Sequence, residues 1–252
     1  AKKRMYMTAT PRLFSESSKK KAEEGSVEIC SMDDPKLYGD EMYRIGFGEA
    51  VEKQLLSDYK VLVLTIDPLA MTESLQLSLA TDSGEVLSDD EAKLIGCFNA
   101  LSKITLVDDH QLKETDPQPM KRAVAFSQNI KISKEVTTLI NDLEDSYYEA
   151  LKPEAQKQTV RAKAMHIDGG MGASARDERL AWLKADIDDG ECRILNNVRC
   201  LSEGVDVPSL DAVLFLSARD SEVDVVQSVG RVVRTAPGKK NGYLIISVFV
   251  SA

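Results

Sequence analysis

The sequence has neither a long hydrophobic run nor a cluster of metal-binding side chains. Hydrophobic residues make up 43% of the chain, yet no uninterrupted stretch of them approaches the ~20 residues that cross a bilayer, so a membrane-spanning protein is excluded. The cysteines form no Cys-x-x-Cys pair and there are two histidines, so neither a zinc site nor a disulfide framework is expected. We expect reduced thiols and a cytoplasmic location. The cysteines are Cys30, Cys97, Cys192 and Cys200.

An excess of positive charge is also lacking. The formal net charge is -9, which argues against a protein that grips nucleic acid over its whole surface, because phosphate contacts supply most non-specific affinity. The basic runs at Lys2–Arg4 and Lys19–Lys21 are short enough to be solvated surface. Any contact with nucleic acid is therefore expected to be local.

The sequence contains no turn that could hold nucleotide phosphates by itself. No Gly-x-x-x-x-Gly-Lys-Ser/Thr pattern occurs, and the glycines at 169, 170 and 172 are followed by Ala and Ser without a lysine. No Asp-Glu-x-His box precedes Thr8. The chain also opens at Ala1 without Met and enters a strand-like segment, Arg4–Thr10, so we interpret it as a fragment of a longer protein.

The first part of the chain differs in pattern from the rest. A polar stretch at 15–25 is expected to be a loop, and a turn-rich segment at 31–40 follows it. We place a domain boundary near Gly39, which gives one segment at 1–39 and a domain at 40–252.

Beyond that boundary, apolar runs of strand length alternate with amphipathic helical segments. This alternation is typical of a parallel sheet with helices on both faces. The predicted strands are 60–66, 122–127, 163–167, 193–198, 212–216 and 243–248, and the predicted helices are 48–56, 133–151, 173–185 and 223–233. Between 67 and 121 two further helices, at 71–80 and 89–102, predict a helical insertion or a helical connector.

One chemically informative segment is a strand that runs into a polar turn at 193–208. Gly204 and Asp206 lie in this turn. Ligands of open α/β sheets bind beyond the carboxyl ends of the strands, so these residues could border a ribose or a phosphate. A glycine and an aspartate are also ordinary turn residues, and the turn alone leaves both interpretations open.

The next segment carries a stripe of polar side chains on a predicted helix. Gln227, Arg231 and Arg234 follow one another at i, i+4 and i+7, while five valines cover the other side. Guanidinium groups match phosphate oxygens bidentately, so the stripe suits a γ-phosphate during transfer. Gly230 inside the helix costs ~1 kcal/mol relative to Ala and suggests the close approach of a backbone or ligand. We expect both arginines to point outward, near the carboxyl edge of the sheet.

These segments resemble the motifs of superfamily 2 helicases in their order. The segment 227–234 resembles motif VI, 202–208 motif V, 8–11 motif III, 122–127 the strand of motif IV, and 166–171 the next nucleic-acid-facing segment. The resemblance covers the whole chain and is nearest to restriction-enzyme motors of types I, III and ISP. It implies an α/β fold, the second RecA-like lobe (P-loop NTPase type, parallel sheet) with a helical insertion at about 67–121, preceded by the tail of the first lobe at 1–39.

The resemblance also implies roles for individual residues. Arg234 would be the arginine finger, assisted by Arg231 and Gln227. The nucleotide sugar would be bordered by Gly204 and Asp206, and Thr8 and Thr10 would couple nucleotide state to nucleic-acid contact. The implied nucleic-acid contacts are Ser127, Gln128, Asn197, Arg199 and Gly169. One departure is Val198, which stands where many relatives have a hydroxyl residue.

By the same resemblance, the intact protein would use ATP and Mg²⁺, with neither held by this chain alone. Its partners would be the missing first RecA-like lobe, double-stranded DNA, and nuclease or methyltransferase domains of the same protein, with no membrane partner. A binding or regulatory module on the same lobe is an alternative, although it would be expected to lose the arginine stripe. Another parallel α/β enzyme, such as a nucleotide-binding transferase, would need its own glycine-rich phosphate turn.

Overall fold

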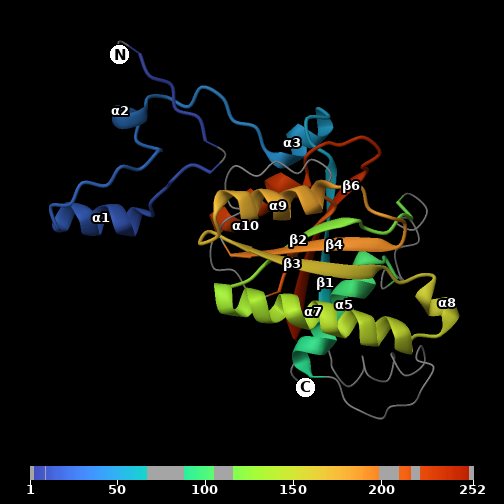
Figure 1. Cartoon of the computed structure of the whole chain (residues 1–252). Helices are drawn as coiled ribbons and strands as arrows, with labels where there is room; N and C mark the ends of the chain where they lie inside the picture. The colour runs from blue at the N-terminus through green and yellow to red at the C-terminus, as the bar shows by residue number, and fades with distance from the viewer. Residues whose placement is uncertain are drawn as a thin grey trace. The chain divides into compact units, whose positions relative to one another are not determined.

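The computed structural model in Figure 1 describes residues 3–8, 10–66, 88–104, 116–198, 210–216 and 222–249. The chain divides into two compact units, residues 1–52 and 53–252. The boundary expected near Gly39 falls inside the first unit, and the assignment of 1–39 to a preceding lobe stays a prediction.

The first unit is held together by local interactions. Its helices are α1 (Glu16–Glu24), α2 (Pro35–Tyr38) and α3 (Phe47–Glu52). The prediction of a loop at 15–25 is wrong, because the side chain of Ser15 caps α1 by accepting a hydrogen bond from the Ser18 amide. The strand predicted at Arg4–Thr10 is also wrong, since the described residues of this segment form neither helix nor strand and pair with none of the described strands.

The second unit is built on one sheet in which all pairs of strands are parallel. Its order is β1-β6-β5-β2-β4-β3. All six predicted strands are confirmed, with ends that differ by one or two residues. Their bounds are β1 Asp58–Ile66, β2 Arg122–Phe126, β3 Arg161–Asp168, β4 Glu191–Val198, β5 Ala212–Phe215 and β6 Asn241–Phe249.

Helices cover both faces of this sheet, as the alternating pattern predicted (Figure 1). One face carries α5 (Asp89–Leu101) over β1 and β6 and α7 (Ile130–Ala150) over β3 and β4; the other carries α9 (Ala173–Lys184) and α10 (Glu222–Val232). The short helix α8 (Pro153–Gln156) follows α7. Helix α5 contributes Phe98 and Leu101 to the core, each at most 1% exposed, so it acts as a connector between β1 and β2. The other helix predicted here, 71–80, lies outside the described residues.

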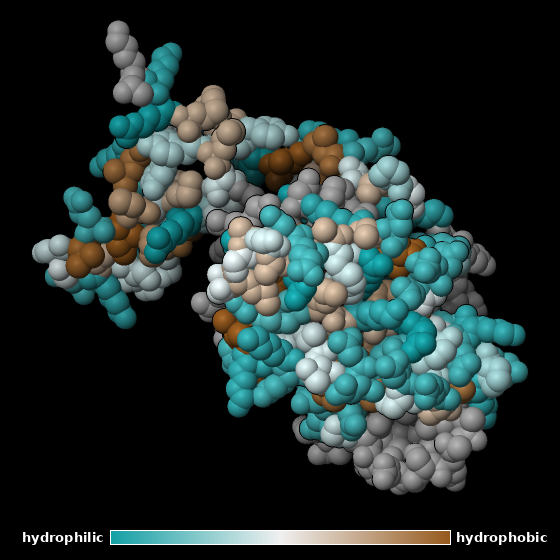
Figure 2. Space-filling model, in the orientation of Figure 1, coloured by the Kyte–Doolittle hydropathy of each residue, from teal (hydrophilic) through white to brown (hydrophobic). Residues whose placement is uncertain are grey.

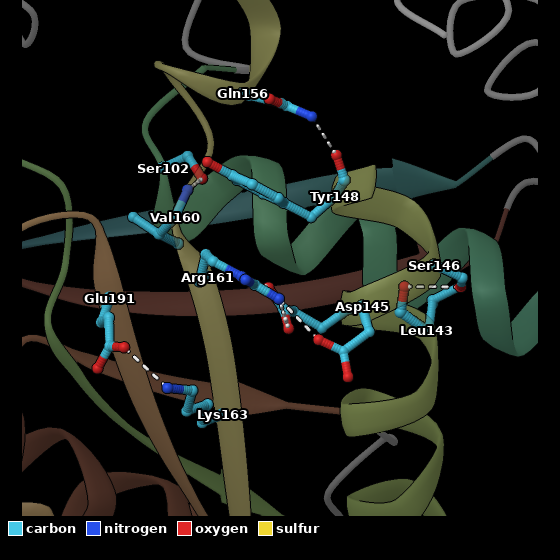
Figure 3. A network of polar contacts seen from close by, with 11 residues as sticks. Ser102, Leu143, Asp145, Ser146, Tyr148, Gln156, Val160, Arg161, Lys163 and Glu191 are labelled. Atoms are coloured by element: carbon cyan, nitrogen blue, oxygen red, sulfur yellow. Dashed lines mark hydrogen bonds and ion pairs between the residues drawn. The ribbon is translucent and has the colours of Figure 1, made fainter. Parts of the chain in front are cut away.

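Helix α7 is fastened to the edge strand β3 by ionic contacts, which Figure 3 shows from close by. Arg161 of β3 donates to Glu144 at 2.7 Å and to Asp145 at 2.6 Å. Hydrogen bonding to Glu144 raises the pKa of Arg161. Because the Glu144 side chain is only 5% exposed, its charge depends on Arg161 for compensation.

The two units differ in how they use apolar side chains. Ala50 is the buried hydrophobic residue found among the described part of 1–52, whereas the core residues of 53–252 come from the strands and all four long helices. Brown apolar patches are visible on the surface of the first unit in Figure 2. Large hydrophobic side chains exposed in this unit include Met7 (87%), Met42 (82%) and Tyr43 (67%). Among the described helices, none has the length and apolar character needed to span a membrane.

Candidate functional site

Gln227 and Arg231 lie on α10, which ends at Val232, and Arg234 follows two residues later, so the stripe expected on one helix continues past the helix end. Val229, Val232 and Val233 are at most 8% exposed, so they form the inner side. Arg234 is exposed and Arg231 is half-buried. The exposure of Arg234 fits the expectation of an outward side chain, whereas the Nε atom of Arg231 is buried, so an outward direction of both arginines stays a prediction. Gln227 lies in α10, but its side chain is outside the described residues.

The two guanidinium groups are close enough to influence each other. Burial, and after it the positive charge of Arg234, lowers the pKa of Arg231. Arg231 is thus a cation that is partly removed from water and lies near the like charge of Arg234, which is exposed. An anion with several oxygens would relieve both penalties, because guanidinium groups bind phosphate oxygens by paired hydrogen bonds.

Gly230 leaves open space beside these arginines. A Cβ atom added to it would have no described heavy atom within 4 Å. The close approach of another backbone, which we considered from the sequence, is therefore not made by any described part of this chain. The alternative that a ligand or another protein segment comes close to Gly230 stays a prediction.

The end of α10 is fixed by contacts from two other parts of the second unit. Ser57, just before β1, donates its amide to the carbonyl of Val233 at 2.7 Å. The Lys239 ammonium donates to the carbonyls of Val232 and Arg234, the latter at 3.1 Å, and to that of Leu210, just before β5, at 2.6 Å. Burial lowers the pKa of Lys239 to about 8.

These contacts correct one expectation about the site. Ser57 and Leu210 precede β1 and β5, so the last turn of α10 lies at the amino ends of the strands, whereas we expected Arg234 near the carboxyl edge. The reason is that α10 follows β5 and precedes the parallel strand β6, so it must run back across the sheet. A ligand of Arg234 would therefore lie beside α10. Gly204 and Asp206 are outside the described residues, and their proximity to the arginines stays a prediction.

Gly242 at the start of β6 allows this close packing. A Cβ atom at this position would lie 2.4 Å from the oxygen and 2.9 Å from the carbon of the Val232 carbonyl. Real Cβ atoms do not approach a backbone this closely, so the position requires glycine as long as the end of α10 stays where it is.

A second set of polar residues lies at the carboxyl ends of β2, β4 and β3. Ser127 and Asn197 were expected to contact nucleic acid, but their side chains are 2% and 0% exposed. Ser127 donates to the Asn196 side chain at 2.9 Å, and the Asn197 amide donates to the carbonyl of Ala125 at 2.9 Å. In this arrangement neither side chain presents an atom to a ligand; both support the strand ends.

His166 continues this buried polar set toward the loop after β3. Its Nδ1 is 2.7 Å from the Ser133 hydroxyl and its Nε2 is 2.7 Å from a carboxylate oxygen of Asp168. The other Asp168 oxygen accepts from the Gly170 amide at 2.7 Å. The hydrogen bond from His166 is the main reason that the pKa of Asp168 is lowered. Ser133 is fully buried, so this arrangement orients a loop and does not expose a nucleophile.

The remaining predicted site residues are found in different places. Gln128 and Gly169 are exposed directly after β2 and β3, at the carboxyl edge. Thr8 accepts a hydrogen bond from the amide of Thr10 and donates one to its carbonyl, both at 3.1 Å. Arg199 lies outside the described residues. Among the residues that the structure describes, no group of His, Cys, Asp or Glu side chains could hold a metal ion.

Sequence reasoning missed the residues that fix α10. Ser57, Lys239 and Gly242 are distant from the helix in sequence or follow it in a turn, and no motif marks them. Two signals were nevertheless available. Pro237 and Gly238 predict a tight turn that would bring Lys239 back to the helix end, and a glycine inside a strand often marks close approach of another backbone.

The all-parallel six-stranded sheet with helices on both faces is a RecA-like α/β fold. The model of the family "Helicase conserved C-terminal domain" matches residues 102–236, more than half of the chain. The chain therefore belongs to the helicase C-terminal domain family, and the resemblance to a superfamily 2 second lobe is confirmed.

Solved structures agree with the restriction-enzyme resemblance. The chain is 38% identical to the DNA-bound ATP-dependent type ISP restriction-modification enzyme LlaBIII, with a TM-score of 0.73, over 99% of this chain and 16% of that one. A fragment assigned as an HsdR subunit of a type I restriction enzyme from Vibrio vulnificus YJ016 has the same fold, at 17% identity and a TM-score of 0.51, over 88% of this chain and 38% of that one.

Among curated proteins, the chain is similar to one classed by inference as helicase 22 of the Sulfolobus islandicus filamentous virus (isolate Iceland/Hveragerdi). The two are 27% identical over 92 residues, which is 36% of this chain and 16% of that protein. The chain thus spans 16% of the length of both LlaBIII and the viral protein.

Proposed function

We propose that this chain is the second motor lobe of an ATP-dependent DNA translocase of the restriction-enzyme kind. In that role it supplies the arginine side of the ATP site and part of the DNA track. The observation that carries the proposal is the pair Arg231, half-buried in the last turn of α10, and Arg234, exposed just after it, with open space at Gly230. The similarity to LlaBIII supports ATP and DNA as its ligands.

The chemistry of the site follows from the guanidinium groups. Phosphoryl transfer develops charge on the equatorial oxygens of the moving group, and donors already held in place stabilise that charge. Arg234 would contact those oxygens, while Arg231 and Gln227 would assist and Gly204 and Asp206 would border the sugar. Mg²⁺, which neutralises phosphate charge when bound, would be held by the first lobe.

The DNA track is proposed for the carboxyl edge of the sheet. Gln128 and Gly169 are exposed there, and the buried contacts of Ser127, Asn197 and His166 hold their loops. Arg199, which follows β4, would reach the same edge. A net charge of -9 favours a small number of phosphate contacts. Sequence specificity or further affinity for DNA would be supplied by other domains.

The first unit supports the presence of a partner lobe. Its apolar side chains, such as Met7, Met42 and Tyr43, remain exposed in this chain. In an interface with another protein segment, these side chains would lose their contact with water, which favours association. We therefore assign its partner as the rest of the first RecA-like lobe, with Thr8 and Thr10 coupling the lobes.

The test compares the chain with a longer protein in which a first lobe precedes it. The chain alone is expected to hydrolyse no ATP. In the longer protein, Arg234→Ala should lower DNA-stimulated kcat by about 10³ to 10⁵-fold while ATP binding is retained, because an arginine finger acts on the transition state. Normal turnover in Arg234→Ala would overturn the proposal in favour of a binding or regulatory module.

A further inference from the structure

We propose that Lys239 is a positioning residue for the arginine finger, acting by holding the last turn of α10. This inference rests on the proposed function of Arg234. Lys239 lies outside the motif residues and would not contact the nucleotide. Its effect would be transmitted through the backbone of Arg234, which is the residue proposed to contact the nucleotide.

The first support is the number of backbone groups that Lys239 and one other residue bind. The carbonyls at the end of a helix have no partners within the helix. Here the carbonyls of Val232 and Arg234 accept from Lys239, and the carbonyl of Val233 between them accepts from the Ser57 amide. Three consecutive carbonyls, the last belonging to Arg234 itself, are thereby fixed.

The second support is that the same ammonium group reaches a strand. Lys239 donates to the carbonyl of Leu210 at 2.6 Å, directly before β5. The end of α10 is thus tied to the sheet through a single cation. A cation at this place is also favoured by the partial negative charge at the end of a helix.

The third support is the turn that delivers Lys239. The Lys239 amide donates to the carbonyl of Ala236 at 3.1 Å, and Gly238 has a φ of 77°. Pro237 followed by a glycine with positive φ is typical of a type II turn. The turn reverses the chain directly after Arg234 and Thr235, so that Lys239 returns to the carbonyls of the helix it has just left.

Packing makes the position of Arg234 sensitive to this contact. Gly242 leaves no room for a Cβ beside the Val232 carbonyl, and the Ser57 amide binds the Val233 carbonyl, so β6 and the segment before β1 both border the end of α10. Loss of the Lys239 donors would remove this partner from the Val232 carbonyl and would leave the Arg234 carbonyl with the longer contact from the Ser57 hydroxyl, at 3.4 Å. A displacement of about 1 Å from productive geometry can cost about 10²-fold in rate.

The experiment measures ATP turnover in the longer protein in which a first lobe precedes this chain. Lys239→Met should lower DNA-stimulated kcat by about 10²-fold with KM for ATP and affinity for duplex DNA unchanged. Lys239→Arg, which keeps a cationic donor, should restore most of kcat. The matched control is Lys240→Met, a change of the same size at the exposed neighbouring lysine, which should leave kcat at the level of the unmodified protein.

A second variant covers the case in which Lys239→Met fails to fold. Lys239→Gln keeps an amide donor on a shorter side chain that cannot reach all three carbonyls, and it should show the same loss of kcat with unchanged KM. Unchanged kcat in a folded Lys239 variant, together with a large loss in Arg234→Ala, would overturn this inference alone. Unchanged kcat in Arg234→Ala would overturn the proposed function as well.

Discussion

Replacing Gly242 by alanine tests whether the end of α10 rests on β6 as described. The added Cβ would lie 2.4 Å from the Val232 oxygen, so the helix end or the strand must move by about 1 Å to reach an ordinary contact distance. Overpacking of this kind costs about 1–3 kcal/mol. The hydrogen bonds from Lys239 to the same turn would weaken as well, at about 0.5–1.5 kcal/mol for each bond lost.

The expected loss of stability is therefore about 2–4 kcal/mol, because the two costs act together. For a unit of this size each kcal/mol lowers Tm by about 2–4 °C, so Gly242→Ala should lower Tm by roughly 5–15 °C. Thermal unfolding of the purified chain, followed by circular dichroism, measures this directly.

The matched control is Gly169→Ala, since a Cβ there would meet no described atom within 4 Å. Its stability should change by less than about 0.5 kcal/mol, as for most surface substitutions. If Gly242→Ala melted at the same temperature as Gly169→Ala, the close contact between Gly242 and Val232 would be refuted, and with it the fixed position of Arg234.

Two further predictions separate stability from function. Gly230→Ala should stabilise the chain by about 0.5–1 kcal/mol, because alanine is the better helix former and the site is open. The same variant should lower kcat of the longer protein, because the added methyl group would enter the proposed nucleotide site. An unchanged kcat would contradict that placement. Arg161→Met should lower the free energy of unfolding in urea by about 3 kcal/mol, because it leaves the buried Glu144 uncompensated. Lys163→Met is its control, with an expected loss below about 1 kcal/mol, since the pair of Lys163 with Glu191 is exposed at its lysine; equal losses in the two variants would refute the role given to Arg161.

The sheet was predictable because burial dictates its sequence. Residues such as Ile194, Leu195 and Val213 are at most 1% exposed, and strands covered on both faces must be apolar on nearly every residue. The structure of the first unit was harder to predict from its sequence. Helix α1 is stabilised by a serine cap and by the ion pairs of Lys19 with Glu16 and Asp33. Polar residues of these types are also common in loops, so they did not distinguish a helix from a loop.

Only part of the candidate site could be predicted from the sequence. The spacing predicted Arg231 and Arg234 on one helical stripe, but α10 ends at Val232 and Arg234 lies beyond it. The sequence could not show that Asn197 faces inward, because a buried asparagine is allowed wherever the amide finds backbone partners, and here it binds the Ala125 carbonyl. Nor could it show that the helix ends against Ser57, since that contact joins residues that lie far apart in the chain.

The pairing of β1 with β6 has a consequence for how the chain acquires its structure during synthesis. The first strand of the sheet emerges from the ribosome roughly 180 residues before its partner, which at about 5–20 residues per second is on the order of 10–40 s. Over this interval the backbone donors and acceptors of β1 lack the neighbour that the finished sheet gives them. A nascent chain arrested before β6 would therefore lack the strand that pairs with β1. It would also lack Gly242, against which the end of α10 packs. The pairing of β1 and the positioning of Arg234 therefore both require that β6 has been synthesised.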